Sequence, residues 1–234
     1  MNDSATTVFS GKVLARTATV HIDEVCNAFL DDCFRQYGIE VVPLPDDGVN
    51  LLQSQKFEAC LVRLYDPDAD KILQAVRNSP SNCHAVIYGI VRNAQEALRH
   101  AAYGVNAFLN EPLDPPVVMQ VLRFTQGMVM NELRRYLRIP WISTCDVETR
   151  RGNATVTTID VSSGGVCVLS PKKLAGEGAA RVTLSLDHVS YVVVRAFFCW
   201  EREGAEPVYG LRFDPADFER AKIKAWIDQY LGIA

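Results

Sequence analysis

The stretch TIDVSSGGVCVLS, from Thr158 to Ser170, predicts a strand, a tight turn and a second strand. Gly164 and Gly165 supply the conformational freedom that such a turn needs. Asp160 and Ser162 come just before them, two residues apart, so at the end of a strand both side chains are expected on one face. Two interpretations follow: these groups satisfy backbone N–H groups of their own turn, or they face a ligand.

Further strands are predicted on the C-terminal side of this turn. The segment RVTLSLD (181–187) alternates apolar and polar residues, as a half-buried antiparallel strand does. SYVVVRAFFCW (190–200) and VYGLRF (208–213) are rich in β-branched and aromatic residues. Closely spaced strands separated by Gly and Pro turns predict a small barrel or sandwich, with antiparallel strands.

One helix is predicted to close the chain. Asp214 suits its N-cap, Pro215 its first position and Gly232 its exit. The apolar stripe of this helix is expected to consist of Ile223, Trp226, Ile227, Tyr230 and Leu231.

The first part of the chain alternates strand-like and helix-like segments instead. Strands are predicted at 12–16, 39–44, 59–65, 84–90 and 106–110. Helices are predicted at 24–37, 46–55, 69–78, 94–102 and from Pro115 or Pro116 onward. This order is typical of a doubly wound parallel sheet with helices on both faces. We therefore expect an α/β domain at 10–130 and a β domain at 131–234, joined within 130–141.

The composition of the chain argues against several classes of function. The 234 residues carry a net charge of −4, which argues against a general nucleic-acid or acidic-membrane binder. No apolar run is long enough to span a bilayer. The seven cysteines are scattered without a C-x-x-C pair, which predicts reduced thiols in a cytoplasm and no zinc site.

The βα order and the segment AYGVNAFLNEPLD (102–114) make residues 10–130 resemble a response-regulator receiver domain. The residues that carry phosphotransfer in that family are replaced. Arg63 stands where the resemblance places the acceptor aspartate, Gly89 where it places a small hydroxyl residue, and Glu111 where it places a lysine. Acidic residues for magnesium are also missing directly after the first predicted strand.

These replacements predict a receiver-like domain without phosphotransfer, because that reaction needs a metal and a cation to neutralise developing charge. Asp66 and Asp68 are the alternative acceptors, but the segment DPDAD (66–70) is typical of a turn that caps the next helix. We expect the domain to bind a protein partner or to form a homodimer.

A second group of charges lies at the predicted domain junction. In RRYLRIPW (134–141), Arg134 and Arg138 are four residues apart and share a side of either a helix or a strand, whereas Arg135 points elsewhere. Pro140 predicts that a helix ends here and becomes a strand. The two cations either complement the dipole of the helix or converge on one ligand from a flexible arm.

The pattern R-x-x-x-R followed by D-x-S-x-x-G makes residues 132–232 resemble the PilZ domain, a small β-barrel that binds cyclic di-GMP. The resemblance implies that Arg134 and Arg138 clamp the dinucleotide and that the turn forms its floor. The implied ligand-binding set is Arg134, Arg135, Arg138, Asp160, Ser162, Gly164 and Gly165. No catalytic residue, metal or cofactor is implied.

The leading hypothesis is therefore a bacterial, non-enzymatic cyclic di-GMP receptor in which binding reorients the two domains to control a partner protein. The alternative is a ligand-independent PilZ-like adaptor that acts through protein contacts. An enzyme is a third class, but His21, His84, His100 and His188 are dispersed without a nucleophile–base pattern. Motility, pili, exopolysaccharide and virulence all stay open as the downstream process.

Overall fold

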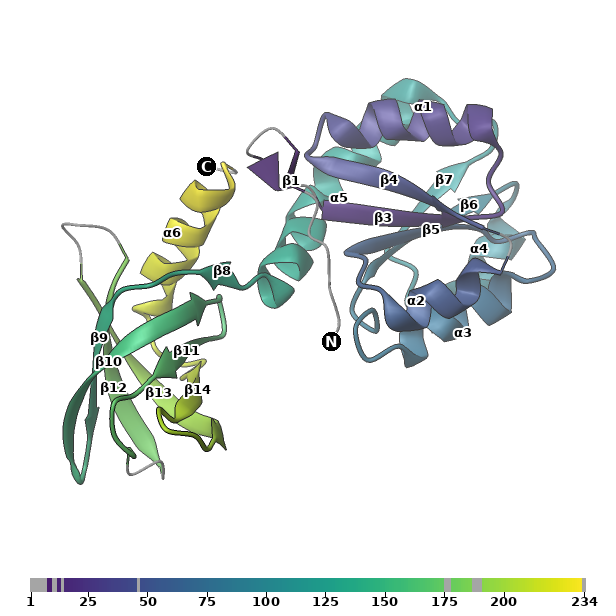
Figure 1. Cartoon of the computed structure of the whole chain (residues 1–234). Coiled ribbons are helices and arrows are strands. Elements are labelled where there is room, and N and C mark those ends of the chain that lie inside the picture. Colours follow the sequence, from purple (N-terminus) through teal and green to yellow (C-terminus); the bar gives the residue numbers. More distant parts are fainter. Residues whose placement is uncertain are drawn as a thin grey trace. The chain divides into compact units, whose positions relative to one another are not determined.

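The computed structural model describes residues 8–9, 12–13, 15–45, 47–174, 178–186 and 191–232 (Figure 1). The chain divides into two compact units, Met1–Leu133 and Arg134–Ala234. Each unit has its own sheet, and the two sheets differ in kind. In the part of the chain described here, no helix is both long and apolar enough to cross a membrane.

Within its described residues, the first unit contains a five-stranded parallel sheet in the order β4-β3-β5-β6-β7. The first of these strands therefore lies between the second and the third, which is the order of doubly wound, receiver-like sheets. This confirms the predicted fold class. The strands are β3 (Ala15–Val20), β4 (Ile39–Leu44), β5 (Ala59–Arg63), β6 (Val86–Val91) and β7 (Ala107–Asn110).

Helices cover both faces of this sheet, as Figure 1 shows for α1 on one face and α3 on the other. Side chains cap two of them: Asp23 accepts a hydrogen bond from the Cys26 N–H at the start of α1, and Asn93 does so from Glu96 at the start of α4. The helical elements are α1 (Glu24–Arg35), η1 (Gly48–Asn50), α2 (Leu51–Ser54), α3 (Ala69–Asn78), α4 (Ala94–His100), η2 (Ala101–Tyr103) and α5 (Pro115–Tyr136).

The first predicted strand was placed too early. Instead of 12–16, the central strand is β3 (Ala15–Val20), and Lys12–Val13 forms β2, which pairs with β1 (Val8–Phe9). The polar side chains of Thr17 and Thr19 concealed this strand, because they are fully buried. The Thr19 hydroxyl donates to Asn27 Oδ1 at 2.7 Å, which satisfies it inside the core. The predicted helix 46–55 is instead η1 followed by α2, and Asp46 lies outside the described residues.

In the second unit, six described antiparallel strands close into a barrel, because β10 pairs with both β9 and β11. This confirms the predicted β domain as a barrel. Its strands are β9 (Thr144–Thr149), β10 (Gly152–Val161), β11 (Gly165–Leu169), β12 (Ala179–Ser185), β13 (Tyr191–Arg202) and β14 (Val208–Phe213). A short strand, β8 (Ile139–Pro140), adds to the end of β10.

The closing helix α6 (Arg220–Leu231) begins later than predicted. Asp214 does not cap it: its carboxylate accepts from the Ala216 N–H and stabilises a separate turn that includes Pro215. The exit was predicted correctly, since Gly232 ends the helix in the left-handed conformation at φ 65°. The side chains of Ile223, Ile227 and Leu231 are buried, whereas Tyr230 is exposed.

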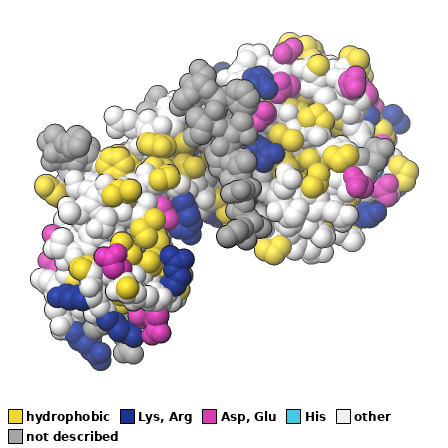
Figure 2. Space-filling model, viewed as in Figure 1, with side chains coloured by type: hydrophobic (Ala, Val, Ile, Leu, Met, Phe, Trp, Pro, Cys, Tyr) yellow, Lys and Arg dark blue, Asp and Glu magenta, His cyan; other side chains and the backbone are white. Residues whose placement is uncertain are grey.

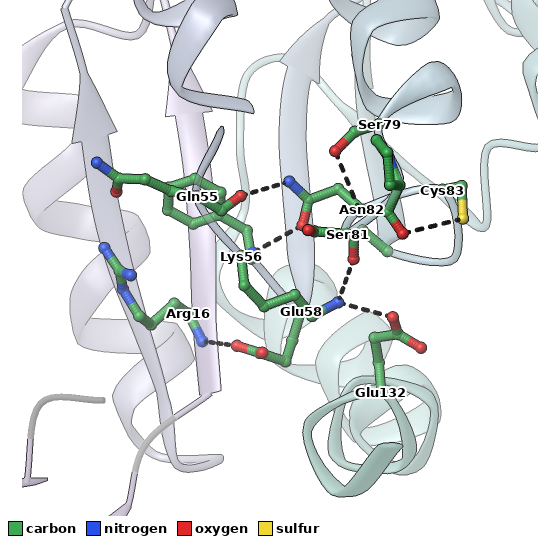
Figure 3. A network of polar contacts seen from close by, with 12 residues as sticks. Arg16, Gln55, Lys56, Glu58, Ser79, Ser81, Asn82, Cys83 and Glu132 are labelled. Atoms are coloured by element: carbon green, nitrogen blue, oxygen red, sulfur yellow. Dashed lines mark hydrogen bonds and ion pairs between the residues drawn. The ribbon is translucent and has the colours of Figure 1, made fainter. Parts of the chain in front are cut away.

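A buried polar network ties the end of α5 to the amino-terminal edge of the parallel sheet (Figure 3). Lys56 Nζ donates to Glu132 Oε1 at 2.7 Å and to the Ser81 carbonyl at 2.9 Å. The Asn82 side chain donates to two backbone carbonyls and accepts from the Phe57 N–H at 2.8 Å. Such satisfied buried groups fix one arrangement, because separating them would leave charges without partners in the interior.

Glu58 belongs to the same edge and is 5% exposed. Its carboxylate accepts from the Arg16 N–H at 2.8 Å. Burial raises the pKa of the Glu58 carboxyl, although the Arg16 N–H and the charge of Lys56 oppose this effect. A raised pKa in the folded state means that stability falls as the pH rises from the unfolded value through the folded one.

The variant Glu58→Gln is therefore expected to gain stability relative to the wild type as the pH rises from about 4 to about 8, because it keeps an acceptor for Arg16 without a buried charge. Urea unfolding across this range measures the difference. Glu206→Gln, at an exposed position, is the matched control for the loss of one negative charge. If the difference in the free energy of unfolding between Glu58→Gln and the wild type does not change with pH, the assignment of a raised pKa to Glu58 is contradicted.

Candidate functional site

The turn after β10 uses the side chain of Ser162 for its own closure. The Ser162 N–H donates to the Gly165 carbonyl at 2.9 Å, and its hydroxyl also donates to this carbonyl at 3.1 Å. The same hydroxyl accepts from the Gly165 N–H at 3.2 Å, and Ser162 is buried. Of the two interpretations of this residue, the geometry supports the turn.

Gly165 is required by close packing between strands. A Cβ atom at this position would lie 2.3 Å from the carbonyl oxygen of Leu211 on β14, so any side chain would separate β11 from β14. Gly164 is different, since no described atom lies within 4 Å of the corresponding position. Its carbonyl accepts from the Phe213 N–H at 2.9 Å. Gly165 therefore builds the barrel, and Gly164 leaves the outside of the turn open.

Asp160 faces outward because a register shift interrupts β10 between Thr158 and Asp160. Thr158 and Val161 are buried, whereas the Asp160 side chain is 22% exposed. Asp160 pairs across the sheet with Pro140 on β8 and Cys167 on β11. The Asp160 carboxylate therefore lies on the outer surface, whereas the Ser162 hydroxyl lies inside the turn.

Arg138 lies between α5 and β8 and reaches this outward carboxylate. Its Nη1 is 3.3 Å from Asp160 Oδ1, and its side chain is 63% exposed. The next residue, Ile139, pairs with Val161, so the β8–β10 ladder holds Arg138 beside the turn. The structure thus brings together one arginine of the R-x-x-x-R pattern and the aspartate of the D-x-S-x-x-G pattern.

Arg134 is held differently. It lies in the last turn of α5, its side chain is only 12% exposed, and its Nε donates to the carboxylate of Asp228 on α6. Its backbone carbonyl accepts from the Ser163 hydroxyl at 3.0 Å. Arg135 is exposed in the same turn. The predicted arm is therefore fixed at Arg134 by a helix and at Ile139 by a strand.

Sequence reasoning missed three residues that organise this region. Asp228 pairs with Arg134, and the Ser163 hydroxyl donates a hydrogen bond to the Arg134 carbonyl at the end of α5. Arg220 Nη2 donates to the Ser163 carbonyl at 3.2 Å. Asp228 and Arg220 lie on α6, far along the chain from the motifs, and nothing in their local sequence marks them. Ser163 occupies an unspecified position of the D-x-S-x-x-G pattern, so only its neighbours in space reveal its contact.

The charges near the turn suit a ligand that carries both an anion and hydrogen-bond donors. Arg134 and Arg138 supply positive charge, and Asp160 supplies an acceptor. Burial raises the pKa of the neighbouring Cys167 thiol; the charge of Asp160 raises it too, whereas Arg138 and Arg202 lower it. Asp160, Arg138 and Arg202 therefore lie within electrostatic reach of the buried Cys167 thiol.

The carboxyl edge of the parallel sheet is a second candidate site, but ion pairs fill it. At the end of β5, Arg63 donates to Asp23 at 2.7 Å and to the His21 carbonyl at 3.1 Å. Beyond it, Glu111 accepts from the Tyr65 hydroxyl and from Arg92 Nε, each at 2.9 Å. The Arg92 guanidinium also lies 3.6 Å from the centre of the Tyr65 ring.

Two further receiver positions, Gly89 and Asp66, lie near the same edge. A Cβ at Gly89 would lie 2.5 Å from the Leu64 side chain, which leaves little room there for a hydroxyl residue. Burial raises the pKa of the Asp66 carboxyl, whereas the nearby charge of Arg63 lowers it. Among the described residues, no group of three or more His, Cys, Asp or Glu side chains is arranged to hold a metal ion.

Comparison with known proteins identifies the second unit. The model of the PilZ domain matches residues 132–229, and domains of this family are cyclic di-GMP-binding effector modules. No curated protein matches the chain.

Several solved structures resemble the chain. The chemotaxis response regulator CheY4 of Vibrio cholerae is 15% identical, with 48% of this chain and 98% of that one covered and a TM-score of 0.43. The receiver domain of the response regulator AraT from Geobacillus stearothermophilus is 17% identical over 52% and 99%, with a TM-score of 0.44. The inhibitor of motility of Bacillus subtilis is 13% identical over 42% and 51%, with a TM-score of 0.35.

Incubation with acetyl phosphate and magnesium is expected to leave the intact mass of the protein unchanged, because the acceptor position holds Arg63 and this arginine is paired with Asp23. Mass spectrometry measures the outcome, with a receiver domain that retains its acceptor aspartate as the positive control. A stoichiometric mass increase that disappears in Asp66→Asn would show that the displaced carboxylate accepts phosphate after all.

Proposed function

We propose that this chain, whose residues 132–229 form a PilZ domain, is a bacterial cyclic di-GMP receptor that acts on a partner protein without catalysis of its own. The observation that carries the proposal is the pairing of Arg138 with Asp160 at 3.3 Å beside the D-x-S-x-x-G turn. It places a cation and an acceptor from the two sequence motifs at one point of the barrel surface.

The two groups match opposite parts of the dinucleotide. A guanidinium binds phosphate oxygens through its planar fork, and it also recognises the O6/N7 edge of guanine. The Asp160 carboxylate can accept from the N1–H and N2–H donors on the opposite edge of the same base. Gly164 leaves the outside of the turn open to close approach, while Ser162 and Gly165 keep the turn in shape.

Binding requires an exchange of partners. Arg138 has to move from Asp160 toward the ligand or share its donors with both, and Arg134 has to do the same with Asp228. Hydrogen bonds to charged groups contribute about 1.5–3 kcal/mol each, so two arginines can offset the ordering of the few residues between α5 and β8. Arg135, exposed in the same turn, is an accessory contact in this proposal.

This exchange of partners would couple ligand binding to a change in how the protein acts on its partner. Residues 134–138 link the two units, so a new arrangement of these residues changes what the receiver-like unit presents to a partner protein. The ion pairs at the carboxyl edge of that unit support a role in binding rather than in phosphotransfer. In this proposal the partner is a cytoplasmic protein or a second copy of this chain.

One observation favours the alternative of a ligand-independent adaptor. Both arginines of the R-x-x-x-R pattern already have carboxylate partners in the structure, Asp228 for Arg134 and Asp160 for Arg138. These pairs satisfy the cations without a nucleotide. An adaptor would use the same barrel as a fixed surface for protein contacts.

Arg138→Ala is expected to weaken cyclic di-GMP binding by about one to two orders of magnitude, which corresponds to the loss of one or more charged hydrogen bonds. Isothermal titration calorimetry gives the affinity and the stoichiometry together. Arg150→Ala removes an exposed arginine at the other end of β10 and is the matched control. Unchanged affinity in Arg138→Ala would refute the site, and a wild type that ignores the nucleotide would favour the adaptor.

Asp228→Asn is expected to strengthen binding severalfold, because the Asp228 carboxylate competes with the ligand phosphate for Arg134. The same titration tests this, with Glu219→Gln near the start of α6 as a control for lost negative charge. Weaker binding in Asp228→Asn would instead mean that the carboxylate holds Arg134 in its binding position.

A further inference from the structure

Helix α5 has a second apolar stripe besides the stripe that packs on the parallel sheet. The buried stripe recurs every three or four residues and comprises Val118, Leu122, Thr125 and Val129. The second stripe keeps the same spacing about 100° away around the helix and comprises Val117, Val121, Phe124 and Met128. Phe124 is 75% exposed, and Met128 and Val117 are 44% and 43% exposed. Large apolar side chains in one exposed row are typical of an interaction surface.

The helix is almost uncharged over this stretch. Between Pro115 and Asn131, Arg123 is the only charged residue in the sequence. The visible face of the first unit, by contrast, mixes hydrophobic side chains with charged ones (Figure 2). A helix that is apolar beyond the stripe covering its own core is typical of a buried helix, and a surface poor in charge but containing Phe and Met is typical of the centre of an interface.

Gly127 leaves a gap beside the second stripe. It follows Phe124 by three residues, so the two positions are neighbours on the helix surface. Apart from the backbone of the helix itself, no described atom lies within 4 Å of the place that a Cβ of residue 127 would occupy. Glycine inside a helix is destabilising relative to alanine, and no packing among the described residues requires it here. A protruding ring and a gap therefore lie side by side on one surface.

The two ends of the stripe carry opposite charges. Asp114 is exposed and directly precedes α5, and Arg135 lies in the last turn of the helix, seven residues after Met128 and so on the same side. The midpoint between Asp114 and Arg135 coincides with the midpoint between Val121 and Met128. Beside a parallel copy of the helix, like charges would meet at both ends, whereas beside an antiparallel copy each end would meet its opposite. The charges therefore favour an antiparallel pair.

These features make the surface complementary to itself. In a pair of copies related by a two-fold axis, every contact between two different residues occurs twice. With the axis near Phe124, the ring of each copy enters the gap at the partner's Gly127. At the same register, Val121 of each copy meets the partner's Met128. An unrelated protein would have to match the ring, the gap and the order of charges separately, whereas a second copy supplies all three.

We propose that α5 pairs with α5 of a second copy of this chain, antiparallel and about a two-fold axis near Phe124. The inference goes beyond the proposed function, because the pairing requires no nucleotide. A single pair of helices buries less than the roughly 1,600 Å² of a standard interface, so the dimer is expected to be weak, with a dissociation constant of about 1–100 µM. The apolar stripe supplies the affinity, and the end charges fix the orientation, since exposed ion pairs contribute little.

Sedimentation velocity of the full chain without nucleotide tests the pairing, over concentrations from about 1 µM to about 200 µM. The wild type is expected to change from monomer to dimer across this range. Phe124→Gln is expected to weaken the dimer at least about tenfold, because it removes the most exposed ring of the stripe from the contact. Leu98→Gln is the matched control: Leu98 is 70% exposed on α4, whose Ala97 packs into the core on the α3 side of the sheet.

Gly127→Leu separates the pairing from an effect on the helix alone. The new side chain has room in the monomer and a better helix propensity, so thermal unfolding at low concentration is expected to shift to higher temperature. The same side chain would fill the gap that the partner's Phe124 occupies, so the dimer is expected to weaken at least about tenfold. A surface that only faces solvent predicts the first effect without the second.

Exchange of the end charges tests the register. Asp114→Lys and Arg135→Glu are each expected to weaken the dimer about threefold, and the double variant is expected to restore it, because it keeps opposite charges opposite. Failure of the double variant to restore the dimer would refute the antiparallel register. A wild type that stays monomeric at the highest concentration, or a dimer that Leu98→Gln weakens and Phe124→Gln does not, would refute the inference. Neither result bears on cyclic di-GMP binding, which calorimetry of the same samples measures separately.

Discussion

The approach of Gly165 to the Leu211 carbonyl is the constraint on which the rest of the barrel site depends. Only a residue without a side chain lets β11 lie against β14 at this point, and this pairing continues the sheet that β10 and β11 close. The Ser162 hydroxyl fixes the same turn from inside. With the turn fixed, the register shift in β10 leaves Asp160 on the outer surface, where Arg138 reaches it.

The arginine–carboxylate pairs of the two units differ in how far they are exposed to solvent. In the first unit, Arg63 pairs with Asp23 and Arg92 pairs with Glu111 at the carboxyl edge of the sheet. In the barrel, the exposed pair of Arg138 and Asp160 costs little to separate, because a surface ion pair is worth about 0–1 kcal/mol. The Arg63 side chain is 18% exposed and the Arg138 side chain is 63% exposed, so the second arginine is the more accessible of the two.

Sequence patterns were sufficient for the architecture and for the neighbourhood of the turn. Strand and helix alternation gave the parallel sheet, and the glycines at 164 and 165 gave the turn, because both depend on local periodicity and backbone freedom. Sequence patterns were insufficient where contacts between residues far apart in the chain determine the structure. Thr17 and Thr19 look polar but are buried in the central strand, and Asp228 meets Arg134 although the two are far apart along the chain. Asp160 faces outward and Ser162 lies inside the turn because of a bulge in β10, and no local sequence pattern marks that bulge.

The buried ion pair of Lys56 with Glu132 has a mechanical consequence for any signal that starts at the barrel. It anchors α5 at Glu132, and the β8 ladder begins at Ile139, so the chain is clamped on either side of residues 133–138. Within this stretch, α5 continues to Tyr136 and Arg134 is bound to Asp228, so only residues 137 and 138 lie outside a helix or a strand. Any force on the Arg138 side chain would therefore act on a two-residue segment held between a helix and a strand.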